Sequence, residues 1–102
     1  MKIIQTLSSQ IEEETRGVKE YAEMALANRD EHPDLANTYH RLAEEEMGHV
    51  NKLHDAVVAI IKDYRNKQGE PPAPMMAVYE YLHKRHIEAA AEAQTLLDMF
   101  KR

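Results

Sequence analysis

Glu46, Met47, Gly48 and His49 form a Glu-x-x-His step. Residues three apart on an α-helix lie side by side on one face, so the carboxylate of Glu46 and the imidazole of His49 could hold one cation between them. The two side chains could equally hydrogen-bond each other in a partly wet core, and a two-residue pattern is too common to choose between these readings. A metal site therefore requires a further ligand.

The apolar pattern around this step indicates which way its side chains point. Glu46 and His49 fill a gap between Leu42 and Leu53 in a series that recurs every three or four residues, as on one face of a helix. The series comprises Leu35, Tyr39, Leu42, Val50, Leu53, Val57, Ile60 and Tyr64. Burying an isolated carboxylate is costly, and the usual remedies are a raised pKa, an ion pair or a metal.

A third candidate ligand comes from the preceding segment. Glu14 lies between Ile11 and Val18 in a second apolar series, whereas the neighbouring glutamates lie off it. This series comprises Leu7, Ile11, Val18, Tyr21, Ala22 and Ala25. No lysine or arginine lies next to the three candidates on the same helix faces, so an ion pair with a basic side chain is not available to them. We therefore predict that Glu14, Glu46 and His49 converge in a buried metal site, with no catalytic residue separate from these ligands.

Three helices would position these residues within one domain spanning residues 1–102. We expect the first over about 6–28, with Ser9 and Glu12 spaced as a capping box. The second should start at Pro33 and run to about residue 66, and a Pro-rich connector at 69–74 should precede a third helix over about 75–101. The short turn before Pro33 predicts an antiparallel hairpin, which brings Glu14 and Glu46 to similar heights because they lie about fifteen and thirteen residues from the turn.

Further histidines and tyrosines are weaker candidates. His86 lies near the centre of the apolar face of the third helix and His83 at its edge, so either is an additional ligand or a satisfied core residue. Tyr21 and Tyr39 are in phase with the site as hydrogen-bond donors, as one-electron partners or simply as core residues. The remaining histidines, His32, His40 and His54, fall off the apolar series and should be exposed.

Two glycines inside the expected helices also require an explanation. Gly17 lies one turn after Glu14, and Gly48 lies inside the Glu-x-x-His step. A glycine in a helix costs about 1 kcal/mol relative to alanine. Each could allow close approach at the site or simply reflect tight packing, and the sequence does not separate these two explanations.

Composition narrows the class of protein. Charged residues make up 30% of the chain and phenylalanine occurs once, in an otherwise Ala-, Glu- and Leu-rich sequence that favours an all-α fold. There are no cysteines, which excludes disulfides and iron–sulfur ligation. The net charge of -5 argues against a nucleic-acid-binding protein. No apolar run approaches the ~20 residues of a membrane span, so we expect a cytoplasmic protein.

The combination of Glu14, Tyr21, Tyr39, Leu42, Glu46 and His49 resembles the first half of a ferritin-like or rubrerythrin-like di-iron bundle, over about residues 5–60. In that superfamily one helix supplies a glutamate, the next a Glu-x-x-His, and a second pair repeats the arrangement. The resemblance implies iron in a di-iron centre, with manganese or zinc as alternatives, and ferroxidase or peroxide-scavenging oxidoreductase activity.

Only half of such a ligand set is present in one chain. The resemblance to encapsulated ferritins therefore implies a homodimer or higher homo-oligomer, in which a two-fold axis completes a four-helix site. An encapsulin shell remains open as a partner, although no docking peptide is recognisable near the carboxy terminus. Two other readings remain: a non-catalytic helical dimerisation or adaptor protein with a vestigial site, and a protein whose metal, such as zinc, is structural.

Overall fold

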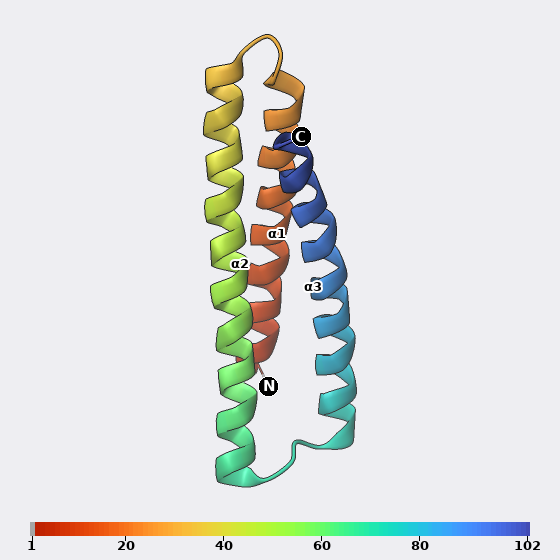
Figure 1. Cartoon of the computed structure of the whole chain (residues 1–102). Coiled ribbons are helices and arrows are strands. Elements are labelled where there is room, and N and C mark those ends of the chain that lie inside the picture. Colours follow the sequence, from red (N-terminus) through yellow and green to blue (C-terminus); the bar gives the residue numbers. More distant parts are fainter. Residues whose placement is uncertain (1) are drawn as a thin grey trace.

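The computed structural model describes residues 2–102, which form three α-helices and no strand: α1 (Lys2–Asn28), α2 (Pro33–Gln68) and α3 (Ala73–Phe100). The chain runs up α1, down α2 and up α3, so α2 is antiparallel to both other helices (Figure 1). The bundle is elongated, with extents of 56 × 20 × 18 Å. Its all-helical class confirms the prediction from composition and periodicity.

Proline and glycine set the helix boundaries. Pro33 occupies the first turn of α2, where its missing N–H leaves no hydrogen bond unmade. Gly69 ends α2 with a positive φ of 79°, which a residue with a Cβ rarely adopts, and its N–H donates to the Arg65 carbonyl. Pro72 precedes α3, so the connector is residues 69–72 and α3 starts two residues before the expected position.

The first helix begins earlier than expected. It starts at Lys2, so Ser9 and Glu12 lie inside α1 and do not cap it. Ile4 and Leu7 are both buried and extend the apolar face toward the amino terminus. Burial of that face stabilises a helix more than a serine cap does, since each large apolar side chain contributes about 1.5–3 kcal/mol and a cap about 1 kcal/mol.

Helix α1 is the centre of the bundle. It packs most extensively against α2 and next against α3, whereas α2 and α3 touch each other least. Ile11 and Val18 of α1 are almost completely buried in the core. Helix α3 lies along the face of α1 that carries Lys19, which pairs with Glu92. Among the described residues, no helix packs over the opposite side of the α1–α2 hairpin.

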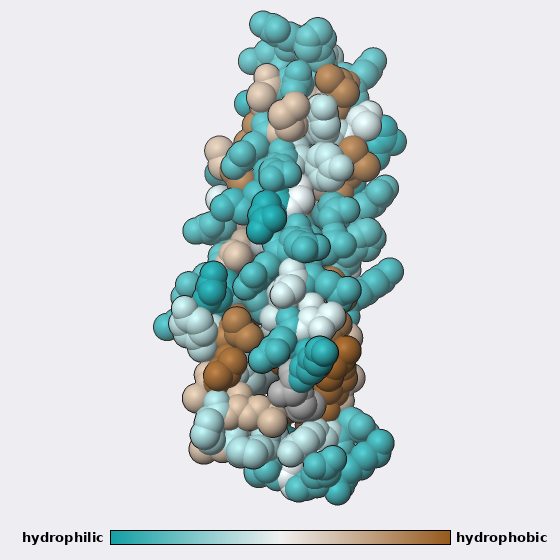
Figure 2. Space-filling view, turned by 180° about the vertical axis from the view of Figure 1, so that it is seen from behind, coloured by the Kyte–Doolittle hydropathy of each residue, from teal (hydrophilic) through white to brown (hydrophobic). Residues whose placement is uncertain are grey.

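Several apolar side chains remain exposed. Ile3, Met24 and Leu35 are exposed, although Ile3 and Leu35 continue the helical spacing of the apolar series on their helices. Leu35 was expected on the buried face and is 44% exposed. The rear view shows larger hydrophobic patches in the half of the bundle near the α2–α3 connector than in the other half (Figure 2). Within residues 2–102, no helix is both long and apolar enough to cross a membrane.

Candidate metal centre

The structure brings Glu14 of α1 together with Glu46 and His49 of α2. One potential ligand atom from each residue lies within 4.8 Å of the others. Nδ1 of His49 is 3.4 Å from Oε2 of Glu14 and 3.7 Å from Oε1 of Glu46. Ligand atoms about 2.1 Å from one metal stand roughly 3–4 Å apart, so both distances from His49 already suit a shared ion.

The antiparallel hairpin explains why these three side chains meet. A short turn over residues 29–32 joins α1 to α2, and the two helices then run side by side (Figure 1). Glu14 and Glu46 are at nearly equal distances from this turn and therefore at similar heights along the bundle. His49 lies next to Glu46 because it is three residues further along the same helix.

The group is partly exposed, contrary to the prediction of a buried site. The side chains of Glu14, Glu46 and His49 are 32%, 26% and 51% exposed. The reason is the position of α3, which packs on the opposite face of the α1–α2 hairpin and leaves this part uncovered. In a single chain, water therefore reaches all three candidate ligands.

The two carboxyl groups differ in proton affinity. A hydrogen bond with Glu14 and partial desolvation raise the pKa of Glu46 above its usual 4.5. The same hydrogen bond lowers the pKa of Glu14, although burial opposes this shift and the nearby His49 supports it. Of the two carboxyl groups, Glu46 therefore keeps its proton to higher pH than Glu14. Two carboxylates this close repel each other when both are ionised, and a proton or a cation relieves the repulsion.

Tyr21 and Tyr39 lie on the same side of the hairpin as the three ligands. Their rings stack on each other with centroids 6.1 Å apart. Tyr21 is seven residues from Glu14, or about 10 Å along the helix axis. The tyrosines thus form a pair about two helical turns from the carboxylates.

His83 and His86 lie elsewhere, on the side of the bundle formed by α3. His83 Nδ1 is 3.1 Å from Nε2 of His54, and their rings stack 4.7 Å apart. His86 is buried near Glu12, with Nε2 3.9 Å from the carboxylate and no hydrogen-bond partner. Within residues 2–102, only Glu14, Glu46 and His49 form a group of three potential metal ligands. The α3 histidines are therefore not additional ligands of that group within one chain.

Two histidines are less exposed than expected. His40 is buried, with Nε2 3.3 Å from the Leu97 carbonyl and its ring stacked on Phe100. His54 is partly buried against His83. Both face α3, which the apolar periodicity of α2 alone did not reveal. Of the three histidines expected to be exposed, His32 alone is exposed.

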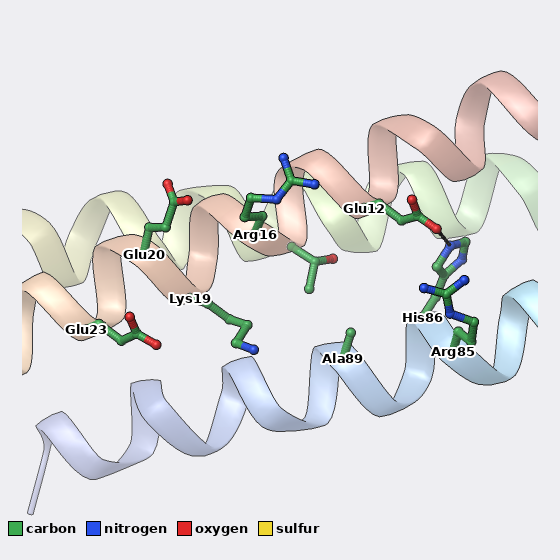
Figure 3. Close-up of a pocket in the computed structure, with 9 residues that line it drawn as sticks. Glu12, Arg16, Lys19, Glu20, Glu23, Arg85, His86 and Ala89 are labelled. Atoms are coloured by element: carbon green, nitrogen blue, oxygen red, sulfur yellow. Dashed lines mark ion pairs between the residues drawn. The ribbon is translucent and has the colours of Figure 1, made fainter.

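A separate groove of about 340 Å³ lies between α1 and α3. Lys19 and Glu23 extend from α1 toward α3, while Arg16 and Glu20 point away from it (Figure 3). Ala89 is small and leaves the space open on the α3 side. The walls carry both acidic and basic groups, so the groove has no single charge that would select a ligand.

Comparison with known proteins leaves the family open: no family model, no curated protein and no solved structure matches this chain.

Proposed function

We propose that this chain is a ferritin-like metal protein in which Glu14, Glu46 and His49 bind a divalent transition metal, most favourably Fe(II). The convergence of these three donors from two helices is the observation that carries the proposal. Mixed carboxylate and imidazole ligands suit Fe(II), Mn(II) and Zn(II). Iron is favoured by the resemblance to di-iron bundles, in which one helix supplies a glutamate and the next a Glu-x-x-His.

The chemistry of the donor set supports a cation. Glu14 and Glu46 lie close enough to shift each other's pKa, and a divalent ion held by both would relieve the repulsion between the ionised carboxylates. His49 lies within reach of both carboxylates and would supply a nitrogen donor. Partial exposure leaves a route for a metal to enter.

A second copy of the chain would complete the site. One chain supplies two carboxylates and one imidazole, whereas a two-fold axis across the uncovered side of the hairpin would supply four and two. Ile3 and Leu35 are exposed, and each lies eleven residues, or about three turns, from Glu14 or Glu46 on the same helix face, so such a dimer would bury them. We therefore assign the di-iron-type centre to a homodimer interface, which would also remove the ligands from water.

Bound Fe(II) would supply one electron per ion to dioxygen or peroxide, which is the basis of ferroxidase and peroxide-scavenging activity. Glu14 and Glu46 would neutralise the higher charge of oxidised iron, and His49 would hold the metal through a ring nitrogen. The paired Tyr21 and Tyr39 lie two turns away on the same face. No other residue of the hairpin is assigned a catalytic role.

The test is oxidation of Fe(II) by purified protein that is loaded without oxygen and then exposed to air. We expect the unmodified protein to oxidise Fe(II) faster than buffer alone, and Glu46→Ala to lose this acceleration. Glu45→Ala is the matched control, because it removes an exposed glutamate one position away on the same helix. If the unmodified protein is no faster than buffer, the oxidase function is wrong.

A structural role for the metal is the second candidate, favoured by the exposed Ile3 and Leu35, which are in phase with Glu14 and Glu46 on their helices. In that case a zinc ion would hold two copies together. Chelation would then convert dimers to monomers, as measured by sedimentation, in a protein that does not accelerate Fe(II) oxidation.

A further inference from the structure

Gly17 faces the carboxylate of Glu46 across the α1–α2 interface. A Cβ added at residue 17 would lie 3.0 Å from Oε2 of Glu46, and the next nearest atoms are also from this side chain, at 3.6 and 3.7 Å. Few Cβ atoms in proteins approach an oxygen this closely. The space that glycine leaves on α1 is therefore occupied by the end of the Glu46 side chain.

Gly48 provides the contrast within the same structure. It also interrupts a long helix, yet a Cβ added there would meet nothing within 4 Å. Both glycines have ordinary helical φ, since the only positive φ among the described residues belongs to Gly69. Backbone conformation therefore explains neither glycine, and only Gly17 has a neighbour that a methyl group would displace.

Displacement of Glu46 would affect the ligands more than the fold. The atom in closest contact is the end of a flexible side chain, which can rotate toward solvent because Glu46 is 26% exposed. Moving the carboxylate would take it away from Glu14 and His49, its two partners in the group. The backbone of α2 need not shift.

We propose that Gly17 is a positioning residue for the metal centre, whose missing side chain leaves the space that lets Glu46 reach Glu14 and His49. This inference rests on the proposed metal-binding function for its consequence, but the steric contact exists without a metal. It predicts that Gly17→Ala preserves or increases stability and still weakens metal binding. If Gly17 served only to let two helices pack closely, the same substitution would lower stability and leave metal binding unchanged.

The first experiment needs no metal and is a double-mutant cycle on thermal unfolding. Alanine is a better helix former than glycine, so Gly48→Ala should raise the Tm by about 4–8 °C. Gly17→Ala should raise it by a similar amount in a Glu46→Ala background, where the contact is gone, and by clearly less in the native background. Equal increases in both backgrounds would overturn the steric contact.

A Glu46→Gln background separates shape from charge. Glutamine keeps the length of the side chain and removes the ionisable group, so Gly17→Ala should again raise the Tm less than it does in the Glu46→Ala background. If Gly17→Ala raises the Tm equally in the Glu46→Gln and Glu46→Ala backgrounds, then charge rather than space governs the contact and the inference fails.

The second experiment measures binding of Mn(II) and Zn(II) by titration calorimetry. We expect Gly17→Ala to weaken binding about 10-fold or more, and Gly48→Ala to leave it unchanged. Equal affinity in Gly17→Ala and the unmodified protein would overturn the positioning role. Absence of binding to the unmodified protein would instead contradict the proposed function, while the unfolding cycle would still decide the contact between residues 17 and 46.

Discussion

Metal binding should stabilise the folded chain, and Glu46→Gln should abolish that effect. Glu14 and Glu46 are more than thirty residues apart in sequence and meet only when α1 and α2 pair. The unfolded chain therefore cannot present the three ligands together, and the metal binds the folded state selectively. Such a ligand adds RT ln(1 + [L]/Kd) to the free energy of unfolding.

The size of the effect follows from this relation. With free metal 100-fold above the Kd, stabilisation is about 2.7 kcal/mol. For a domain of this size, each kcal/mol shifts the Tm by about 4–8 °C, so the expected rise is roughly 10–20 °C. Glutamine retains the shape of Glu46 and a hydrogen bond to Glu14, which keeps the metal-free protein folded, but its neutral amide is a poor ligand.

Thermal unfolding followed by far-ultraviolet circular dichroism measures the effect directly. The unmodified protein should show the rise with Mn(II) or Zn(II) and lose it on addition of a chelator. Glu45→Gln is the matched control and should retain the full rise, since Glu45 is exposed and outside the ligand group. An equal rise in Glu46→Gln would show that the metal binds elsewhere and would refute the assignment.

Three further predictions address protons and the core. Burial lowers the pKa of His86 below its usual 6.5. As the pH falls, the unfolded chain therefore takes up a proton at this residue before the folded chain does. The stability that neutral His86 contributes is complete above pH 6.5 and is lost as the pH falls toward the lowered pKa. Urea titrations from pH 8 to 5 should therefore show a steeper loss of stability in the unmodified protein than in His86→Gln, and parallel losses would contradict the burial argument. Because its hydrogen bond to Glu14 raises the pKa of Glu46, Zn(II) binding should release more protons at pH 5 than at pH 8, as measured by calorimetry in buffers of different ionisation enthalpy. Equal release at both pH values would contradict the raised pKa. Ile11→Ala should reduce the free energy of unfolding by about 2–5 kcal/mol because Ile11 is 1% exposed, whereas Ile87→Ala, at a position 53% exposed, should cost much less; similar costs in urea unfolding would contradict the observed core.

The pairing of the candidate ligands could be anticipated from local rules. The position of Glu14 between Ile11 and Val18 indicates the helix face on which its side chain lies. The short turn before Pro33 sets the relative height of the two antiparallel helices. Each rule concerns neighbours in sequence or one short connection. The structure accordingly brings together Glu14, Glu46 and His49.

The positions of the other histidines could not be anticipated in this way. His40 and His54 lie off the main apolar series of α2, yet they face α3, where His40 stacks on Phe100 and His54 on His83. Periodicity describes one face of a helix and assumes one buried side. A helix that contacts two neighbours at an angle has a second partly buried side, and the polar residues on it give no apolar signal.

The sequence by itself determined that the chain is helical, roughly where its helices end, and which two glutamates and which histidine share a level of the hairpin. Only the tertiary structure decided that α3 packs against the other face of the hairpin, that the candidate ligand group is consequently open to water in one chain, and that the Glu46 carboxylate lies against Gly17. The physical reason is the range of the interactions involved. Helix formation and hairpin register depend on residues close along the chain, whereas exposure and close approach depend on where a third helix lies and on side chains that meet across an interface.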